Sequence, residues 1–129
     1  MFLLDEHVLD NQLEQLVRWH IPAKKIGRNV GVKGMDDQHH IVPLMRALSK
    51  TTFFTHDLGF CGNKFCHQRY CIVVLRVDRY EAANYIRRFL KHPEFQTHKQ
   101  RLGWVFEVHP TIIKGRQVGK TIEKIFRWP

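Results

Sequence analysis

The sequence lacks the features that mark several large classes of protein. No apolar run approaches the roughly 20 residues that a transmembrane helix needs, and the chain reaches Asp5 and Glu6 too early for a signal peptide. Repeats, low-complexity tracts and linker-like segments are missing as well. We therefore expect a single domain over residues 1–129, in the cytoplasm and without a membrane partner.

Cysteine is scarce: the chain has three, Cys61, Cys66 and Cys71, all in one short stretch. An odd number at close spacing does not fit the disulfide framework of a secreted protein, so we expect reduced thiols. His67 lies among them, and Cys and His are ligands that Zn²⁺ accepts, but the spacing C-x4-C-H-x3-C matches no standard zinc motif. A zinc site remains an alternative to thiols with an apolar role.

Acidic residues are also few. The chain has 12 Asp and Glu against 21 Lys and Arg, which gives a net charge of +9. A small domain this basic usually binds a polyanion, and nucleic acid is the first candidate. The basic residues are spread along the chain rather than gathered in a tail. The alternative is a basic protein with no polyanionic partner.

Short apolar runs alternate with amphipathic helical periods along the chain, which predicts an α/β fold with a mostly parallel sheet. The predicted strands cover residues 2–4, 25–27, 51–55, 71–75 and 104–108, and the predicted helices cover 9–20, 41–48 and 78–90. Pro43 requires that the second helix start late or bend. Residues 111–128 predict a C-terminal β-hairpin.

Acidic residues follow two of the predicted strands. Asp5 and Glu6 come directly after the first strand, and Asp57 follows the strand 51–55 by two residues. Asp36 and Asp37 lie just before the second helix. Because the carboxyl ends of parallel strands meet at one edge of a sheet, we expect these carboxylates to lie close together.

Clustered carboxylates repel one another unless a cation is present, and hard ions such as Mg²⁺ and Mn²⁺ prefer oxygen ligands. Each acid also has a simpler interpretation: Asp36 or Asp37 as a helix N-cap, Asp57 as a turn residue and Glu6 as a solvated side chain. The joint placement of Asp5, Asp37 and Asp57 favours a metal site. Such a site activates water and neutralises charge on a phosphodiester, which is nuclease chemistry.

Three segments resemble the signature segments of the small PIN-like domains. They are Phe2-Leu3-Leu4-Asp5-Glu6-His7, Gly34-Met35-Asp36-Asp37-Gln38 and Phe54-Thr55-His56-Asp57-Leu58-Gly59-Phe60. In that family a strand ends in Asp-Glu, a Gly-x-x-Asp precedes a helix, and Thr-x-Asp-x-Asp-Phe follows a strand. The resemblance covers about the first 75 residues well and the C-terminal third loosely.

The resemblance implies a three-layer α/β/α fold and a Mg²⁺- or Mn²⁺-dependent ribonuclease site. Carried over by position, Asp5, Asp37 and Asp57 would be catalytic and would hold the metal, with Glu6 and Asp36 as lesser ligands. Many PIN-like proteins are toxins blocked by an antitoxin protein, and relatives often form homodimers, so these partners are implied too. Gly59 departs from the family, which often has a second Asp there, so the alternative is a weakened or lost metal site.

Basic residues outside these segments are candidates for binding the nucleic acid backbone. The first candidates are Arg46, Lys64, Arg69, Arg87 and Arg88, and Lys50, Lys91, Lys99 and Arg101 extend the set. The alternative is a solvated basic face. Of the nine histidines, His7 and His56 are the ones to test for proton transfer or substrate contact, although a surface role is the default.

The sequence therefore leads to one hypothesis and one rival. The hypothesis is a metal-dependent endoribonuclease of PIN-like type in which a metal-activated water hydrolyses RNA. The rival is a PIN-like module with a weakened site that binds RNA or a partner protein and cuts nothing.

Overall fold

The computed structural model describes residues 1–48 and 50–129, and of residues 37 and 38 it describes the backbone only. The strands are β1 (Phe2–Leu4), β2 (Ala23–Lys25), β3 (Thr51–Thr55), β4 (Tyr70–Leu75), β5 (Trp104–Val108), β6 (Ile112–Gln117) and β7 (Lys124–Arg127). The helices are α1 (Asp10–Arg18), α2 (Val42–Ala47), α3 (Ala82–Lys91) and α4 (His98–Arg101). Short turns of other helical types are η1 (Asp37–Ile41), η2 (Leu58–Phe60) and η3 (Arg79–Glu81).

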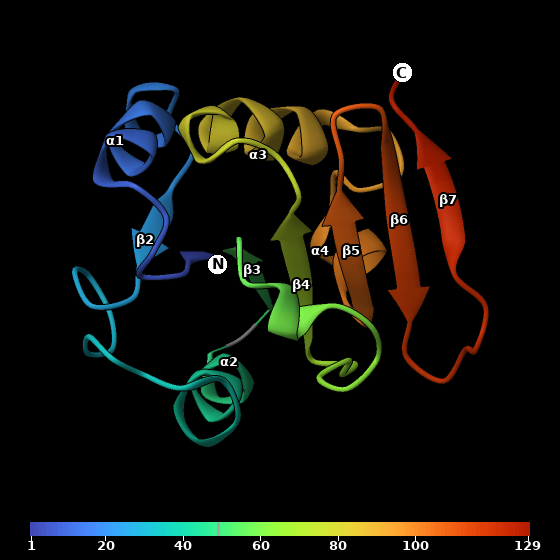
Figure 1. Cartoon of the computed structure of the whole chain (residues 1–129), viewed down its shortest axis with the longest axis horizontal. Coiled ribbons are helices and arrows are strands. Elements are labelled where there is room, and N and C mark those ends of the chain that lie inside the picture. Colours follow the sequence, from blue (N-terminus) through green and yellow to red (C-terminus); the bar gives the residue numbers. More distant parts are fainter. Residues whose placement is uncertain (49) are drawn as a thin grey trace.

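The seven strands form one sheet in the order β2-β1-β3-β4-β5-β6-β7 (Figure 1). Neighbouring strands from β2 to β5 pair in parallel, while β6 and β7 extend the sheet as an antiparallel hairpin. The predicted α/β fold, with a mostly parallel sheet and a C-terminal hairpin, is confirmed.

Alternating side chains of the central strands bury two separate cores. Leu4, on one face, packs with the buried residues of α1 and α3. Leu3, on the other face, packs with buried residues of η1 and α2. All six residues of β4 are buried, as expected for a strand covered on both sides. The central strands therefore lie between two helical layers (Figure 1).

Two helices differ from the sequence-based expectation. The second predicted helix begins as the π-type turn η1, and α2 follows with Pro43 in its first turn, where the missing N–H is least costly. The helix α4 was not predicted, because four residues are too few to show a helical period. Thr97 begins it with a capping box, in which its hydroxyl accepts from the Gln100 N–H at 3.2 Å.

Two further expectations concern covalent state and membranes. Cys61, Cys66 and Cys71 are free thiols, as predicted. Within the described ranges, none of the helices combines the length and apolar character that crossing a bilayer requires.

The strand order changes direction between β1 and β3. From β1 the chain first adds β2 on one side and later adds β3 on the other side. In open α/β sheets, ligands bind outside the carboxyl ends of the strands at such a switch. Asp5 follows β1 and Asp57 follows β3, so both acids lie at this switch point.

Candidate functional site

Asp5 is a buried carboxylate held by neutral donors. It is 5% exposed, and its Oδ2 accepts a hydrogen bond from the Thr55 hydroxyl at 2.6 Å. Its Oδ1 accepts from the Glu6 N–H at 2.8 Å. In the described part of the chain, no cationic side chain forms an ion pair with Asp5. Since buried carboxylates are normally paired, Asp5 stands out as a negative charge without a counterion.

Thr55 links the two acids at the switch point. As the last residue of β3 it is fully buried, and its hydroxyl oxygen also accepts from the Asp57 N–H at 3.0 Å. No role for Thr55 was expected from the sequence. The signal was available, because a threonine that ends a buried strand two residues before an acid is placed to hold that acid's backbone.

Asp57 is exposed and caps the turn that follows it. Its Oδ1 accepts from the Gly59 N–H at 2.8 Å, which starts η2. The turn role considered for Asp57 is therefore real. Its second carboxylate oxygen has no hydrogen bond within the described residues, so the cap leaves Asp57 able to bind a further group.

Glu6 connects the first signature segment to the second. Its Oε1 accepts from the Gly34 N–H at 2.9 Å, and Gly34 has the positive φ of 81° that glycine tolerates best. This bond ties the loop before Asp36 to the carboxyl end of β1. The backbones of all three segments thus converge, while the Asp37 side chain lies outside the described residues.

Asp36 serves as a cap for the η1 turn. Its Oδ1 accepts from the His39 N–H at 2.7 Å, and its Oδ2 lies 3.3 Å from His39 Nδ1 and 3.5 Å from His40 Nδ1. The backbone bond from His39, followed by its ring, holds the pKa of Asp36 below its usual range. The N-cap interpretation accounts for Asp36.

The described residues do not form a complete metal site. No group of three or more His, Cys, Asp or Glu among them is placed to hold a metal ion. The proposed zinc ligands are all described and make no such group; Cys71 is fully buried in β4, and Cys66 Sγ donates to the Gly103 carbonyl at 3.3 Å.

The donors at the Asp5 site nevertheless suit a hard cation. An ionised carboxylate has about four lone-pair positions, and Asp5 uses two of them for hydrogen bonds. Oxygen donors of this kind are what Mg²⁺ and Mn²⁺ prefer. Asp5 and Asp57 supply them here, and the Asp37 side chain is the third that the sequence predicts.

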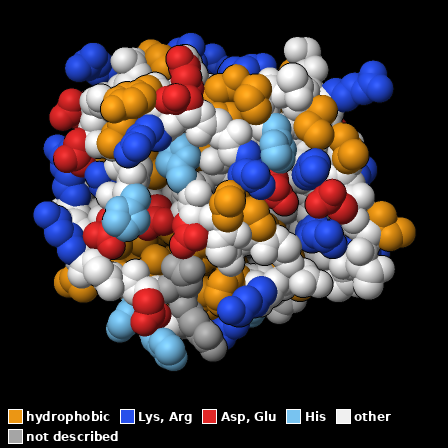
Figure 2. Space-filling model, viewed as in Figure 1, with side chains coloured by type: hydrophobic (Ala, Val, Ile, Leu, Met, Phe, Trp, Pro, Cys, Tyr) orange, Lys and Arg blue, Asp and Glu red, His pale blue; other side chains and the backbone are white. Residues whose placement is uncertain are grey.

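A second polar cluster lies farther along the same sheet edge, beyond β4. Glu107 Oε1 is 3.3 Å from Arg76 Nη1, so its charge is already compensated, and it lies 3.5 Å from His109 Nε2. On the face drawn in Figure 2, acidic side chains gather beside histidines on the left, whereas on the right they alternate with Lys and Arg. His56 donates from Nδ1 to the Leu75 carbonyl at 3.1 Å, which leaves its buried Nε2 without a partner among the described residues.

The predicted nucleic-acid-binding residues fall on two helical layers. Arg46 on α2 and Arg69 before β4 are exposed and lie near His67, whose pKa is lowered first by burial and then by these two charges. Lys64, in the loop before β4, lies over the Phe65 ring at 5.0 Å.

The other two lie on α3, in the opposite layer. Arg87 stacks on Trp19 at 3.8 Å and Arg88 on Trp128 at 4.3 Å. The five residues therefore do not make one continuous surface. Arg101, from the extended set, is not a surface residue at all, because it is 2% exposed.

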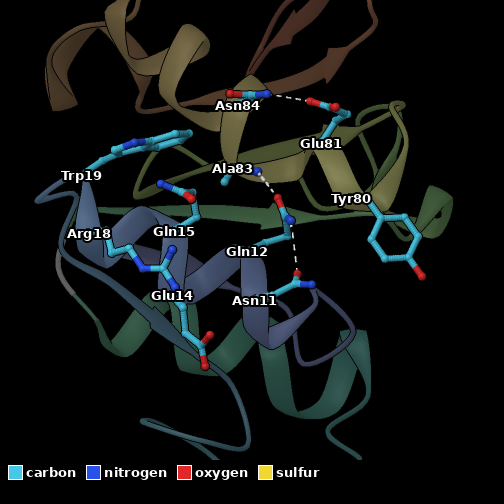
Figure 3. A pocket seen from close by; sticks show the side chains of 10 residues that line it. All are labelled: Asn11, Gln12, Glu14, Gln15, Arg18, Trp19, Tyr80, Glu81, Ala83 and Asn84. Atoms are coloured by element: carbon cyan, nitrogen blue, oxygen red, sulfur yellow. Dashed lines mark hydrogen bonds between the residues drawn. The ribbon is translucent and has the colours of Figure 1, made fainter.

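A hollow of about 350 Å³ lies between α1 and α3 and is lined mainly by amide and charged side chains (Figure 3). Two of its amides are used within the fold: Gln12 Oε1 accepts from the Ala83 N–H at 2.9 Å, and Asn84 Nδ2 donates to Glu81 at 2.6 Å. Tyr80 points away from the hollow (Figure 3). None of the predicted acidic site residues lines it.

No protein-family model, curated protein or solved structure matches the chain. The resemblance to PIN-like domains therefore stays a prediction carried by the three segments.

Proposed function

We propose that the protein is a metal-dependent endoribonuclease of PIN-like type. The observation that supports this most directly is the buried Asp5 at the strand-order switch. It has no ion-pair partner among the described residues and is joined through the Thr55 hydroxyl to the Asp57 N–H. A buried charge without a counterion costs free energy, and a bound cation would offset that cost. The net charge of +9 adds the attraction for a polyanionic substrate.

The residues of this site have separable roles. Asp5 and Asp57, with Asp37 from the second segment, would hold one or two Mg²⁺ or Mn²⁺ ions. Such an ion lowers the pKa of water and neutralises charge that develops on a phosphodiester. Thr55 fixes the orientation of Asp5 through its 2.6 Å hydrogen bond. Glu6 is a positioning residue, since its bond to Gly34 holds the loop that leads to Asp37.

The test compares two acids of the site with a paired acid at the same sheet edge. We expect Asp5→Asn and Asp57→Asn to abolish Mg²⁺- or Mn²⁺-dependent cleavage of single-stranded RNA and to remove the heat of Mn²⁺ binding in calorimetry. The matched control, Glu107→Gln, should keep both, because Arg76 already compensates that carboxylate. Unchanged cleavage by both aspartate variants would overturn the proposal.

The second candidate is a module that binds RNA or a partner protein without cutting. The observation in its favour is that Asp57 caps Gly59, the position where the resembling family often has another Asp. Salt-sensitive RNA binding that needs no divalent ion, with no cleavage under any metal, would favour the module. The antitoxin and the homodimer rest on the resemblance alone.

A further inference from the structure

A basic pocket lies beside Glu6, on the β2 side of the candidate site. Its volume is about 270 Å³, and its walls come from the β1–α1 connection, the end of β2 and the loop that follows. Glu6 and Asp10 contribute the acidic side chains, and Lys25, Arg28 and Lys33 contribute three cationic ones. The lining therefore carries an excess of positive charge in an otherwise acidic neighbourhood.

Lys25 is the unusual member of this pocket. Strand alternation leaves its neighbour Lys24 exposed, while the Lys25 side chain is only 10% exposed. Burial of an ammonium group costs several kcal/mol unless it is compensated. Its compensation is Asp10, whose Oδ1 accepts from Lys25 Nζ at 2.8 Å.

That compensation is shared and incomplete. The same Asp10 oxygen lies 3.2 Å from Arg28 Nη1, so one carboxylate serves two cations, and it is itself 63% exposed. Lys25, followed by Arg28, holds the pKa of Asp10 below its usual range. The second acid of the lining, Glu6, is already bonded to Gly34.

The local backbone keeps the cations in place. Gly27 has a φ of +81°, and a Cβ built there would lie 2.9 Å from Lys33 Cγ. Only glycine therefore lets the Lys33 stem pack against this turn. The Lys25 carbonyl accepts from the Asn29 N–H at 2.9 Å, and the Lys25 N–H donates to Asn29 Oδ1 at 3.0 Å. The turn that carries Arg28 is thus pinned at both ends.

We propose that Lys25, Arg28 and Lys33 form a phosphate-binding subsite for a single-stranded RNA backbone next to the Asp5 site. Phosphate oxygens match the fork of an arginine and the point charge of a buried lysine. Glu6 lines this subsite and directly follows Asp5 in the chain, so a strand bound there would run across the carboxyl ends of β2 and β1. The inference rests on the proposed function for the identity of the strand, but anion binding itself requires no cleavage.

The experiment measures binding of a short fluorescein-labelled single-stranded RNA by anisotropy, in EDTA and over a range of salt concentrations. We expect Arg28→Ala to weaken binding about tenfold and to lower the salt slope by about one ion. Lys25→Met should likewise weaken RNA binding and lower the salt slope. Lys24→Ala, on the same strand but outside the pocket, should change affinity much less.

Asp10→Asn gives the most discriminating result. Removing the shared carboxylate leaves the pocket more cationic, so we expect RNA to bind more tightly, with inorganic phosphate as a competitor. If the ion pair were only structural, Asp10→Asn would lower the melting temperature and leave affinity unchanged. Equal effects of Arg28→Ala and Lys24→Ala, or no RNA binding by the wild type at low salt, would overturn the subsite.

Two further arms separate the possible outcomes. RNA with and without a 5′-phosphate distinguishes a terminal phosphate from a backbone phosphate, and equal affinity supports the backbone. Because no metal is present, the pocket is tested independently of the nuclease. If the protein cleaves RNA but the variants do not change RNA affinity as expected, only the proposed subsite is wrong. If the variants change affinity as expected but the protein cleaves no RNA, only the proposed nuclease function is wrong.

Discussion

Near each end of β3, a threonine hydroxyl contacts a buried charged side chain. The two charged side chains differ in how the surrounding residues bind them. At the amino end, Arg101 is 2% exposed and donates from Nε to Thr52 Oγ1 at 3.0 Å and from Nη1 to the Phe95 carbonyl at 2.7 Å. At the carboxyl end, Asp5 is 5% exposed and receives two hydrogen bonds. Neither residue has an ion-pair partner among the described residues.

The difference lies in where each charge sits in the sheet and in what covers it. All three nitrogens of Arg101 have an acceptor, since Nη2 lies 3.3 Å from His98 Nδ1, and the Phe2 ring covers the guanidinium at 5.3 Å. Asp5 keeps lone pairs that no described residue uses, and it sits at the switch in strand order. Burial of a charge does not by itself mark a binding site. A buried charge with unused hydrogen-bonding capacity at the carboxyl ends of the strands, where the strand order switches, does.

The largest effect that tests this contrast is expected at the amino end. Arg101→Met should lower the free energy of unfolding by about 3 kcal/mol, because it leaves the Thr52 hydroxyl and the Phe95 carbonyl without their charged donor. Urea denaturation measures it. Lys99→Met, exposed on the same helix, is the control and should cost less than about 0.5 kcal/mol. A small loss for Arg101→Met would mean that this charge is not structural.

At the carboxyl end, the hydroxyl of Thr55 can be removed with little change of shape. Thr55→Val should cost about 2 kcal/mol, since Asp5 Oδ2 and the Asp57 N–H both lose a buried partner. Thr51→Val is the matched control: Thr51 lies in the same strand, fully buried, but its hydroxyl makes only a 3.5 Å contact with the Leu48 carbonyl. Equal costs in urea denaturation would show that Thr55 does not hold the two acids.

Neutralising Asp5 should raise the free energy of unfolding, whereas the two preceding substitutions should lower it. Without metal, Asp5→Asn is expected to raise the free energy of unfolding by up to about 1 kcal/mol, because a functional site carries a charge that the fold does not need. Glu107→Gln should lower it by about 0.5 kcal/mol through the loss of its pairing with Arg76. Thermal unfolding in EDTA compares the two. Destabilisation by Asp5→Asn equal to that by Glu107→Gln would make Asp5 a structural charge.

The positions of two acids of the candidate site could be predicted from the sequence, for a physical reason. The apolar run 2–4 located β1 and the Thr- and Phe-rich run 51–55 located β3, and an acid within two residues of the end of a parallel strand lies at the carboxyl edge of the sheet. The positions of Asp5 and Asp57 followed from those two facts. Thr55 was overlooked because a threonine in a strand fits ordinary β propensity, although its position two residues before Asp57 was a usable signal.

The charges were harder to predict than the strands. Arg101 was grouped with the surface residues because burial of an arginine depends on acceptors from Phe95 and Thr52, which are distant in sequence or in other elements. Lys25 broke the apolar pattern of β2, and the strand was consequently expected at residues 25–27 rather than 23–25. In both cases, a buried cation resembles an exposed one until the tertiary contacts are known.

The smallest predicted effect is a lowered pKa of His98, which lies beside Arg101 at the amino end of β3. Burial first, then the amino terminus and Arg101, lowers the pKa of His98 below its ordinary 6.5. The folded state therefore favours the neutral ring, whose Nδ1 can accept from Arg101. This contribution to stability is complete above about pH 6.5 and decreases as the pH falls below that value, where the unfolded chain binds the proton first.

An NMR titration of the His98 ring should give a midpoint below 6.5, and Arg101→Met should raise it. Because Lys50 also lowers this pKa, Lys50→Met is the control for a purely long-range effect and should raise the midpoint less. An unchanged midpoint in Arg101→Met would show that His98 is not the third acceptor of Arg101, and the two ends of β3 would then differ less than proposed.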